Sequence, residues 1–189
     1  MDTFYQAVAT AALVWQAAIA EVGWHHGAIA LAYLGAAWLC LLNAHIARQA
    51  LEAHAIWYGA AIALCLLGAN TVLQADLFMT HLMRATAKLQ GWYGQRQPLQ
   101  YAAVAVLALL VLISSQWLRA VFTASAVACE PVALGMGVLI VLFLVRTVSA
   151  HGTDAVLNWR LLGVSVGRLL EFAGIAWVVY GARRCLLLR

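Results

Sequence analysis

Six long apolar stretches account for most of this chain, and their length constrains the fold more than any other feature. They cover residues 4–20, 27–47, 56–75, 99–118, 131–149 and 161–180. A helix of about 20 apolar residues crosses the hydrocarbon core of a bilayer. Transmembrane β-strands are about half as long and alternate in polarity, which these stretches do not. The sequence therefore predicts an all-α, polytopic transmembrane helix bundle.

The composition agrees with lipid as the main solvent of the protein. Of 189 residues, 66% are hydrophobic and only 10% are charged, whereas about 25% of the residues in a soluble domain are charged. An ordinary soluble enzyme and a nucleic-acid-binding domain are therefore excluded. We expect a single integral membrane domain over residues 1–189. Its expected partners are membrane lipids, together with other membrane subunits or further copies of itself, and not nucleic acid.

The number and direction of the crossings follow from the same stretches. About six spans are expected, or five if the first stretch, which is the shortest, is re-entrant or lies on the surface. With six spans, the N-terminal side carries five Arg and Lys residues and the other side four. An excess of Lys and Arg marks the cytoplasmic side. The count therefore favours cytoplasmic termini, in what we expect to be a bacterial inner membrane.

A different kind of helix is predicted between the third and fourth spans. Phe78, Leu82, Ala85 and Leu89 recur on one helical face, and a second face carries the polar side chains His81, Arg84 and Lys88. Apolar residues on one face and basic residues on another are typical of a helix that lies in the membrane interface. We therefore expect one amphipathic interfacial helix here.

Three ionisable residues fall inside the last two spans, where charge is costly and marks function. Glu171 lies ten residues beyond the start of the 161–180 stretch, which places it about 15 Å deep, near the midplane. Arg168 shares its helical face, and Arg146 lies in the fifth span. We predict that these three residues carry the chemistry of the site, with Glu171 as a proton relay. The alternative is an ion pair of Glu171 with Arg168 or Arg146 that fixes helix register.

Histidines and carboxylates gather on one side of the membrane if the spans alternate. The side opposite the N-terminus receives Glu21, His25, His26, Asp76, His81, His151 and Asp154. Imidazole and carboxylate ligate transition metals, so these seven residues are the predicted ligands of Zn, Cu or Fe. His25, His81 and His151 are the candidates for holding a cofactor, and a b-type haem between two histidines is a further alternative.

Two functions from different classes fit these observations. The first is a metal-binding or proton-handling component of a membrane oxidoreductase or transport system, with a polar cavity that opens to one side of the bilayer. Glu171, Arg168 and Arg146 would form the floor of that cavity, and the histidines and aspartates would surround its mouth. The second is an accessory subunit without chemistry, whose polar residues fix the packing of helices against partner chains.

Overall fold

The computed structural model describes residues 2–49, 54–91, 130–148, 157–161 and 164–188, together with positions 94, 102, 105, 106 and 109. The predicted fourth span, 99–118, lies outside the described residues apart from four single positions. The described part contains six helices and one two-stranded ladder. These elements are α1 (Asp2–Ala20), α2 (Trp24–Gln49), α3 (Ala55–Leu73), α4 (Ala75–Leu89), α6 (Glu130–Val148), β1 (Arg160–Leu161), β2 (Val164–Ser165) and α8 (Val166–Leu187).

The prediction of an all-α fold is confirmed for this part of the chain. Three helical segments are long and apolar enough to cross a membrane: Trp24–Gln49, Ala55–Leu73 and Glu130–Thr147. They correspond to the predicted second, third and fifth spans. The apolar part of α1, Phe4–Ala20, is shorter. Helix α8 contains Arg168, Glu171, Arg183 and Arg184, so it is less apolar than the other three.

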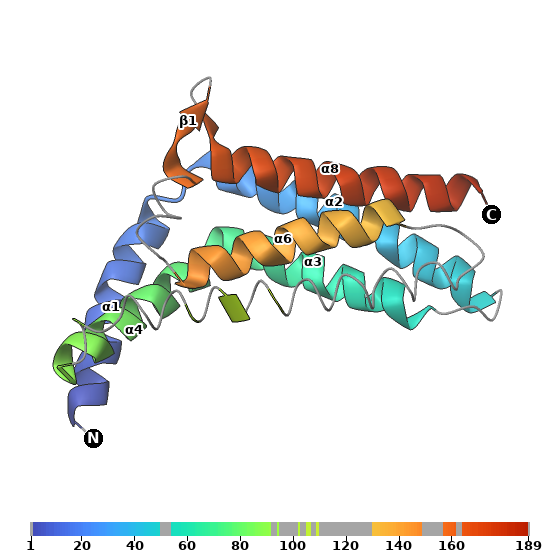
Figure 1. The fold of residues 1–189 in the computed structure, drawn as a ribbon. Helices are drawn as coiled ribbons and strands as arrows, with labels where there is room; N and C mark the ends of the chain where they lie inside the picture. Colours follow the sequence, from blue (N-terminus) through green and yellow to red (C-terminus); the bar gives the residue numbers. More distant parts are fainter. Residues whose placement is uncertain are drawn as a thin grey trace.

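Helices α2, α3, α6 and α8 lie along one another as a bundle, and α1 and α4 form an inclined pair at one end of it (Figure 1). Helix α2 runs parallel to α8, because Tyr33 and Asn43 contact Glu171 and Ala182, respectively. The α1–α4 pair is joined to the end of α3 by Trp15, whose indole N–H donates to the Leu73 carbonyl at 2.6 Å. The Trp15 ring also lies against Phe78, with ring centroids 5.5 Å apart.

Glycines allow α6 and α8 to approach closely. A Cβ atom at Gly135 would lie 2.7 Å from the Gly174 carbonyl oxygen, and one at Gly181 would lie 2.8 Å from the Val132 backbone nitrogen. Both distances are shorter than any van der Waals contact. The two helices therefore pack backbone to backbone, as small residues permit in membrane proteins.

The beginning of the last helix differs from the prediction. Leu161 pairs with Val164 in the β1–β2 ladder instead of opening a helix. Helix α8 begins only at Val166, where the Ser165 hydroxyl accepts a hydrogen bond from the Arg168 backbone N–H at 3.4 Å. Ser is a preferred residue at this N-cap position. Glu171 therefore lies five residues into α8, about 7.5 Å along its axis, instead of ten residues into a helix that begins at Leu161.

The core of the described bundle is apolar except at two residues. Its largest fully buried side chains include Leu64, Leu139 and Val178. The two buried polar side chains are Asn43 and Glu171. Asn43 donates to the carbonyls of Leu39 and Ala182, so it ties α2 to α8. Glu171 lies nearer the end of the bundle, beside a polar cavity.

Candidate functional site

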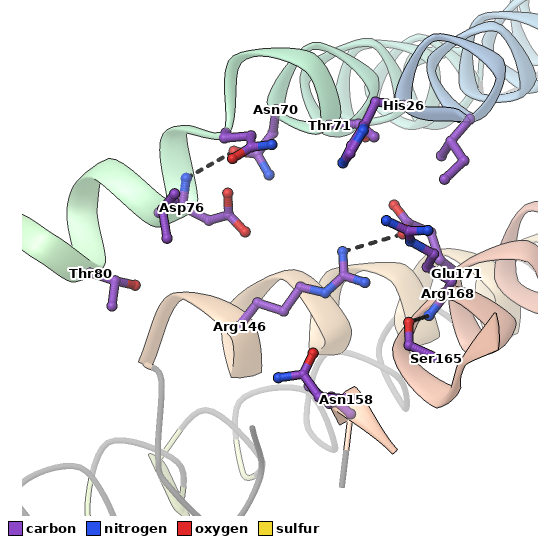
Figure 2. Close-up of a pocket in the computed structure, with 14 residues that line it drawn as sticks. His26, Asn70, Thr71, Asp76, Thr80, Arg146, Asn158, Ser165, Arg168 and Glu171 are labelled. Carbon is purple, nitrogen blue, oxygen red and sulfur yellow. Dashed lines mark hydrogen bonds and ion pairs between the residues drawn. The ribbon is translucent and has the colours of Figure 1, made fainter. Parts of the chain in front are cut away.

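A cavity of about 420 Å³ lies at the end of the bundle where α2 and α8 begin and where α3 and α6 end. Figure 2 shows side chains from opposite sides of the bundle pointing toward this space. Its lining comprises His26, Ile29, Asn70, Thr71, Gln74, Asp76, Leu77, Thr80, Arg146, Leu157, Asn158, Ser165, Arg168 and Glu171. The antiparallel and parallel helix pairs bring these residues together from five separate segments of the sequence.

Glu171 is the most deeply buried charged group of the cavity. Its side chain is 6% exposed, and its Oε2 lies 3.2 Å from Nη1 of Arg146, whose side chain is 32% exposed. The Tyr33 hydroxyl donates to Oε1 of Glu171 at 3.1 Å. One carboxylate therefore connects α2, α6 and α8. Of the two arginines predicted as partners of Glu171, the structure pairs it with Arg146.

Arg168 has a different partner, at the first turn of α2. Its Nη2 lies 2.9 Å from Nε2 of His25. A guanidinium group can only donate, so Nε2 of His25 accepts this hydrogen bond and cannot carry a proton. The lone pair of that nitrogen is therefore engaged and is not offered to a metal ion. The His25 and His26 rings lie against each other, with centroids 4.1 Å apart.

Asp76 faces the same cavity from the opposite wall, at the start of α4 (Figure 2). The chain turns sharply just before it, because Gln74 adopts a left-handed conformation with φ of 49°. The Asp76 backbone N–H donates to Oδ1 of Asn70 at 3.0 Å, which fixes the start of the helix. Among the described residues, the Arg146–Glu171 contact is the single salt bridge. Asp76 and Arg168 therefore bring an anion and a cation to the cavity without an ionic partner in this part of the chain.

The structure brings together only part of the predicted metal set. His26 and Asp76 line the cavity, and His25 lies beside it through Arg168. His81 is half-buried on α4 outside the lining, and Glu21 is exposed between α1 and α2. His151 and Asp154 lie outside the described residues. Within the described ranges, no three His, Cys, Asp or Glu side chains form a group that could hold a metal ion.

His81 belongs instead to the basic face of α4. Burial lowers the pKa of the His81 imidazole below its usual value, and the nearby Arg84 guanidinium lowers this pKa further. Both effects disfavour the charged form of the ring. The pKa of His81 therefore depends on the packing of α4, and His81 does not line the cavity.

Tyr33 is the partner of Glu171 that sequence reasoning missed. It lies within the apolar stretch 27–47, where an aromatic residue is unremarkable by composition. Its backbone packs closely on α3, because a Cβ atom at Gly68 would lie 2.9 Å from Cβ of Tyr33. A buried tyrosine hydroxyl needs a hydrogen-bond partner. That requirement was the signal available in the sequence, and Glu171 fulfils it.

No family model matches this sequence. No curated protein and no solved structure matches it either. The geometry of the cavity is therefore the basis for inferring a function.

Proposed function

We propose that this chain is a multi-pass membrane protein that binds a small polar ligand in a cavity open at one end of its helix bundle. The observation that carries the proposal is the lining of that cavity. Arg146, Arg168, Glu171 and Asp76 all face it, in a chain of which only 10% is charged. Ionisable groups within membrane helices are costly, and they are retained where they face water or a ligand.

The cavity is best understood as a one-sided pocket. Beyond Glu171 and Tyr33, the described core continues through apolar residues such as Leu139 and Ile175, and Asn43 is its one other buried polar side chain. Asn43 donates to two backbone carbonyls. A continuous polar path to the opposite end of the bundle would need further polar groups. Ligand binding from one side is therefore favoured over conduction through these helices.

Five crossings fit the helix directions. Helix α3 ends at the cavity, whereas α6 begins at the far end, where Val132 lies against Gly181. The sequence between them contains the apolar stretch 99–118, which has the length that one crossing requires. Helix α8 then runs back beside α2. Helix α1 packs on α4 outside the bundle (Figure 1), so we propose that α1 does not cross.

Two signals bear on the orientation in the membrane and point in opposite directions. The end of the bundle away from the cavity carries Arg48, Arg183 and Arg184, and the five-to-four excess of basic residues at this end favours the cytoplasm. Cys185, near the same end, is disulfide-bonded. Disulfides form in oxidising compartments, which favours the opposite orientation. The side from which the cavity can be labelled distinguishes the two.

Thiol accessibility tests the cavity directly. Thr71→Cys places a thiol in the cavity lining, and the matched control Leu66→Cys places one on the same helix at a position that is 66% exposed on the apolar surface. Both are made in a Cys65→Ala background, because Cys65 is an exposed free thiol. A membrane-impermeant maleimide should modify the first variant from one side of the membrane and leave the second unmodified. Lack of reaction at position 71 would contradict a water-filled cavity.

Proton exchange at Glu171 is the second candidate function. It is favoured by the burial of this carboxylate between Arg146 and Tyr33 at the cavity wall. Glu171→Gln removes the exchangeable charge and keeps the shape of the side chain. A proton-handling protein reconstituted in vesicles should lose pH-dependent activity with this substitution. A variant that folds and retains every activity would favour the accessory role, in which Glu171 only fixes the register of three helices.

The metal-binding hypothesis requires residues beyond the described ranges. His151 and Asp154 would have to join His26 and Asp76 to complete a ligand set. Metal analysis of the purified protein tests this directly. Stoichiometric Zn, Cu or Fe that is lost on His26→Ala substitution would support the metal-binding hypothesis. A metal-free protein that is still labelled at position 71 would reject this hypothesis and leave the proposal of a ligand-binding cavity intact.

A further inference from the structure

Two opposite charges on facing walls distinguish this cavity from a simple anion or cation site. Arg168 lines it from α8 and Asp76 from α4. We propose that the cavity takes a small zwitterion, a ligand that carries an ammonium group and a compact anion a few bonds apart. This inference rests on the proposed function, since it names the chemistry of the ligand for the same cavity.

Arg168 is the expected contact of the anionic end. One of its guanidinium nitrogens, Nη2, is engaged by Nε2 of His25 at 2.9 Å, which holds the side chain in place. A guanidinium has five N–H donors in a planar fork. The remaining donors suit two oxygens of one carboxylate or phosphate group. Nε2 of His25 accepts this hydrogen bond, so the ring positions the arginine without supplying an opposite charge.

Asp76 is the expected contact of the ammonium end. Its backbone N–H is engaged by Asn70, so the main chain is fixed and the carboxylate is left to face the cavity (Figure 2). An ionised carboxylate can only accept hydrogen bonds. The neighbouring side chains Asn70, Thr71 and Gln74 are also polar and uncharged. They can accept further hydrogen bonds from an ammonium group without adding charge.

The charge balance of the lining favours a zwitterion over an ion of either sign. Arg146 and Glu171 neutralise each other at 3.2 Å. The charges that remain on the described lining are the cation of Arg168 and the anion of Asp76. A ligand of one sign would leave the other charge half-buried and unpaired, which is costly. A zwitterion satisfies both, and about 420 Å³ is sufficient for a small molecule or a lipid headgroup.

Two kinds of molecule carry an ammonium group close to a compact anion, namely an ethanolamine phospholipid and a free amino acid. A binding experiment distinguishes them. The whole protein in an uncharged maltoside detergent is titrated calorimetrically with dihexanoylphosphatidylethanolamine, with L-alanine and with dihexanoylphosphatidylglycerol. The last probe has the same phosphate and acyl chains but no ammonium group. At least one of the two zwitterions should bind. The affinity for phosphatidylglycerol should be lower by about tenfold or more, because this probe cannot make the charged hydrogen bond from an ammonium group to Asp76. Binding of the lipid alone identifies a headgroup, and binding of alanine identifies a soluble ligand.

Substitutions of Asp76 and Arg168 test which of these two residues binds each end of the ligand. Asp76→Asn should weaken the zwitterion about tenfold and abolish the preference over phosphatidylglycerol, and Arg168→Gln should weaken all probes. Arg168→Lys keeps the cation and should retain measurable binding if Arg168→Gln disturbs folding. The matched controls are Glu21→Gln and Arg160→Gln, which remove charges at exposed positions and should leave binding unchanged.

Two results would overturn the zwitterion. One is equal binding of phosphatidylglycerol and phosphatidylethanolamine, which would identify an anion site. The other is no binding of either zwitterion by a protein in which position 71 is still labelled. That second result rejects the ligand class and leaves the polar cavity intact, whereas an unreactive position 71 rejects the cavity itself.

Discussion

Glu171 owes its place in the bundle to two side chains from other helices. Arg146 supplies the opposite charge at 3.2 Å, and Tyr33 supplies a hydroxyl donor at 3.1 Å. A carboxylate that is only 6% exposed has lost most of its water. Removing one partner therefore leaves a buried charge uncompensated, which costs more than the pair itself contributes.

A double-mutant cycle on this pair measures that asymmetry. Arg146→Gln should lower the free energy of unfolding by about 2–3 kcal/mol. This loss is at or below the range for removing one partner of a fully buried ion pair, because Arg146 is partly exposed. Glu171→Gln removes the charge that needs compensation, so the double variant should be more stable than the sum of the two single effects. Denaturant titration in detergent micelles measures all four proteins. Strictly additive effects would show that the two side chains are not coupled, and Arg160→Gln, at an exposed position, serves as the control.

His81 predicts how stability depends on pH. Its pKa in the folded protein is lowered by burial and by Arg84, so the unfolded chain binds the proton more readily. The stability that this gives is fully present above the unfolded pKa of about 6.5 and is lost as the pH falls toward the folded value. The melting temperature should therefore drop between pH 7.5 and pH 5.5 by less in His81→Gln than in the unsubstituted protein. The variant His45→Gln, at an exposed position, should keep the full drop.

At the scale of single residues, sequence patterns predicted which residues belong to the cavity better than they predicted which side chains contact each other. Alternation of the spans predicted one polar cavity with Asp76 at its mouth and Arg146 and Glu171 at its floor, and these three residues line one cavity. Which arginine pairs with Glu171 depends on how each helix is rotated about its axis. That rotation is set by close packing such as the Tyr33–Gly68 contact, and a single sequence does not contain it.

Among the helices, α8 shows that an apolar stretch does not by itself predict where a helix begins. Leu161 and Val164 continue the apolar pattern of the helix, yet they pair across the β1–β2 ladder. Ser165 was the available signal, because its hydroxyl caps the helix that follows. Helices α2, α3 and α6 were predicted closely, since their apolar stretches end at polar or charged residues.

The α6–α8 contact makes a sharp prediction for glycine substitution. Gly135→Ala would force a methyl group to within 2.7 Å of the Gly174 carbonyl oxygen, whereas a Cβ atom at Gly137 meets nothing within 4 Å. The first should cost about 1–3 kcal/mol through overpacking, and the second should be neutral or slightly stabilising, since Ala is the better helix former. Thermal unfolding of the two variants in detergent measures the difference. Equal melting temperatures would contradict the close approach of these helices.

At the scale of the whole molecule, the direction of each helix determines which loops share a side of the membrane. The C-terminal end of α4 and the β1–β2 ladder before α8 lie at the cavity end, and the C-terminal ends of α2 and α8 lie at the other (Figure 1). Single cysteines at Gly94 and Arg160 should therefore be labelled from one side by an impermeant maleimide, and those at Gln49 and Leu188 from the other. Labelling of Gly94→Cys and Leu188→Cys from the same side would contradict this arrangement of helices.

A cysteine at Phe4, which is 57% exposed, then decides between five and six crossings. Helix α1 ends where α2 begins, at the cavity end of the bundle, and it packs on α4 through Trp15 and Phe78. If α1 stays on that side, Phe4→Cys is labelled together with Gly94→Cys. If α1 crosses, Phe4→Cys is labelled together with Leu188→Cys. We expect the first result, because the inclined α1–α4 pair lies outside the bundle of α2, α3, α6 and α8 (Figure 1) and its amphipathic member α4 belongs at the membrane surface.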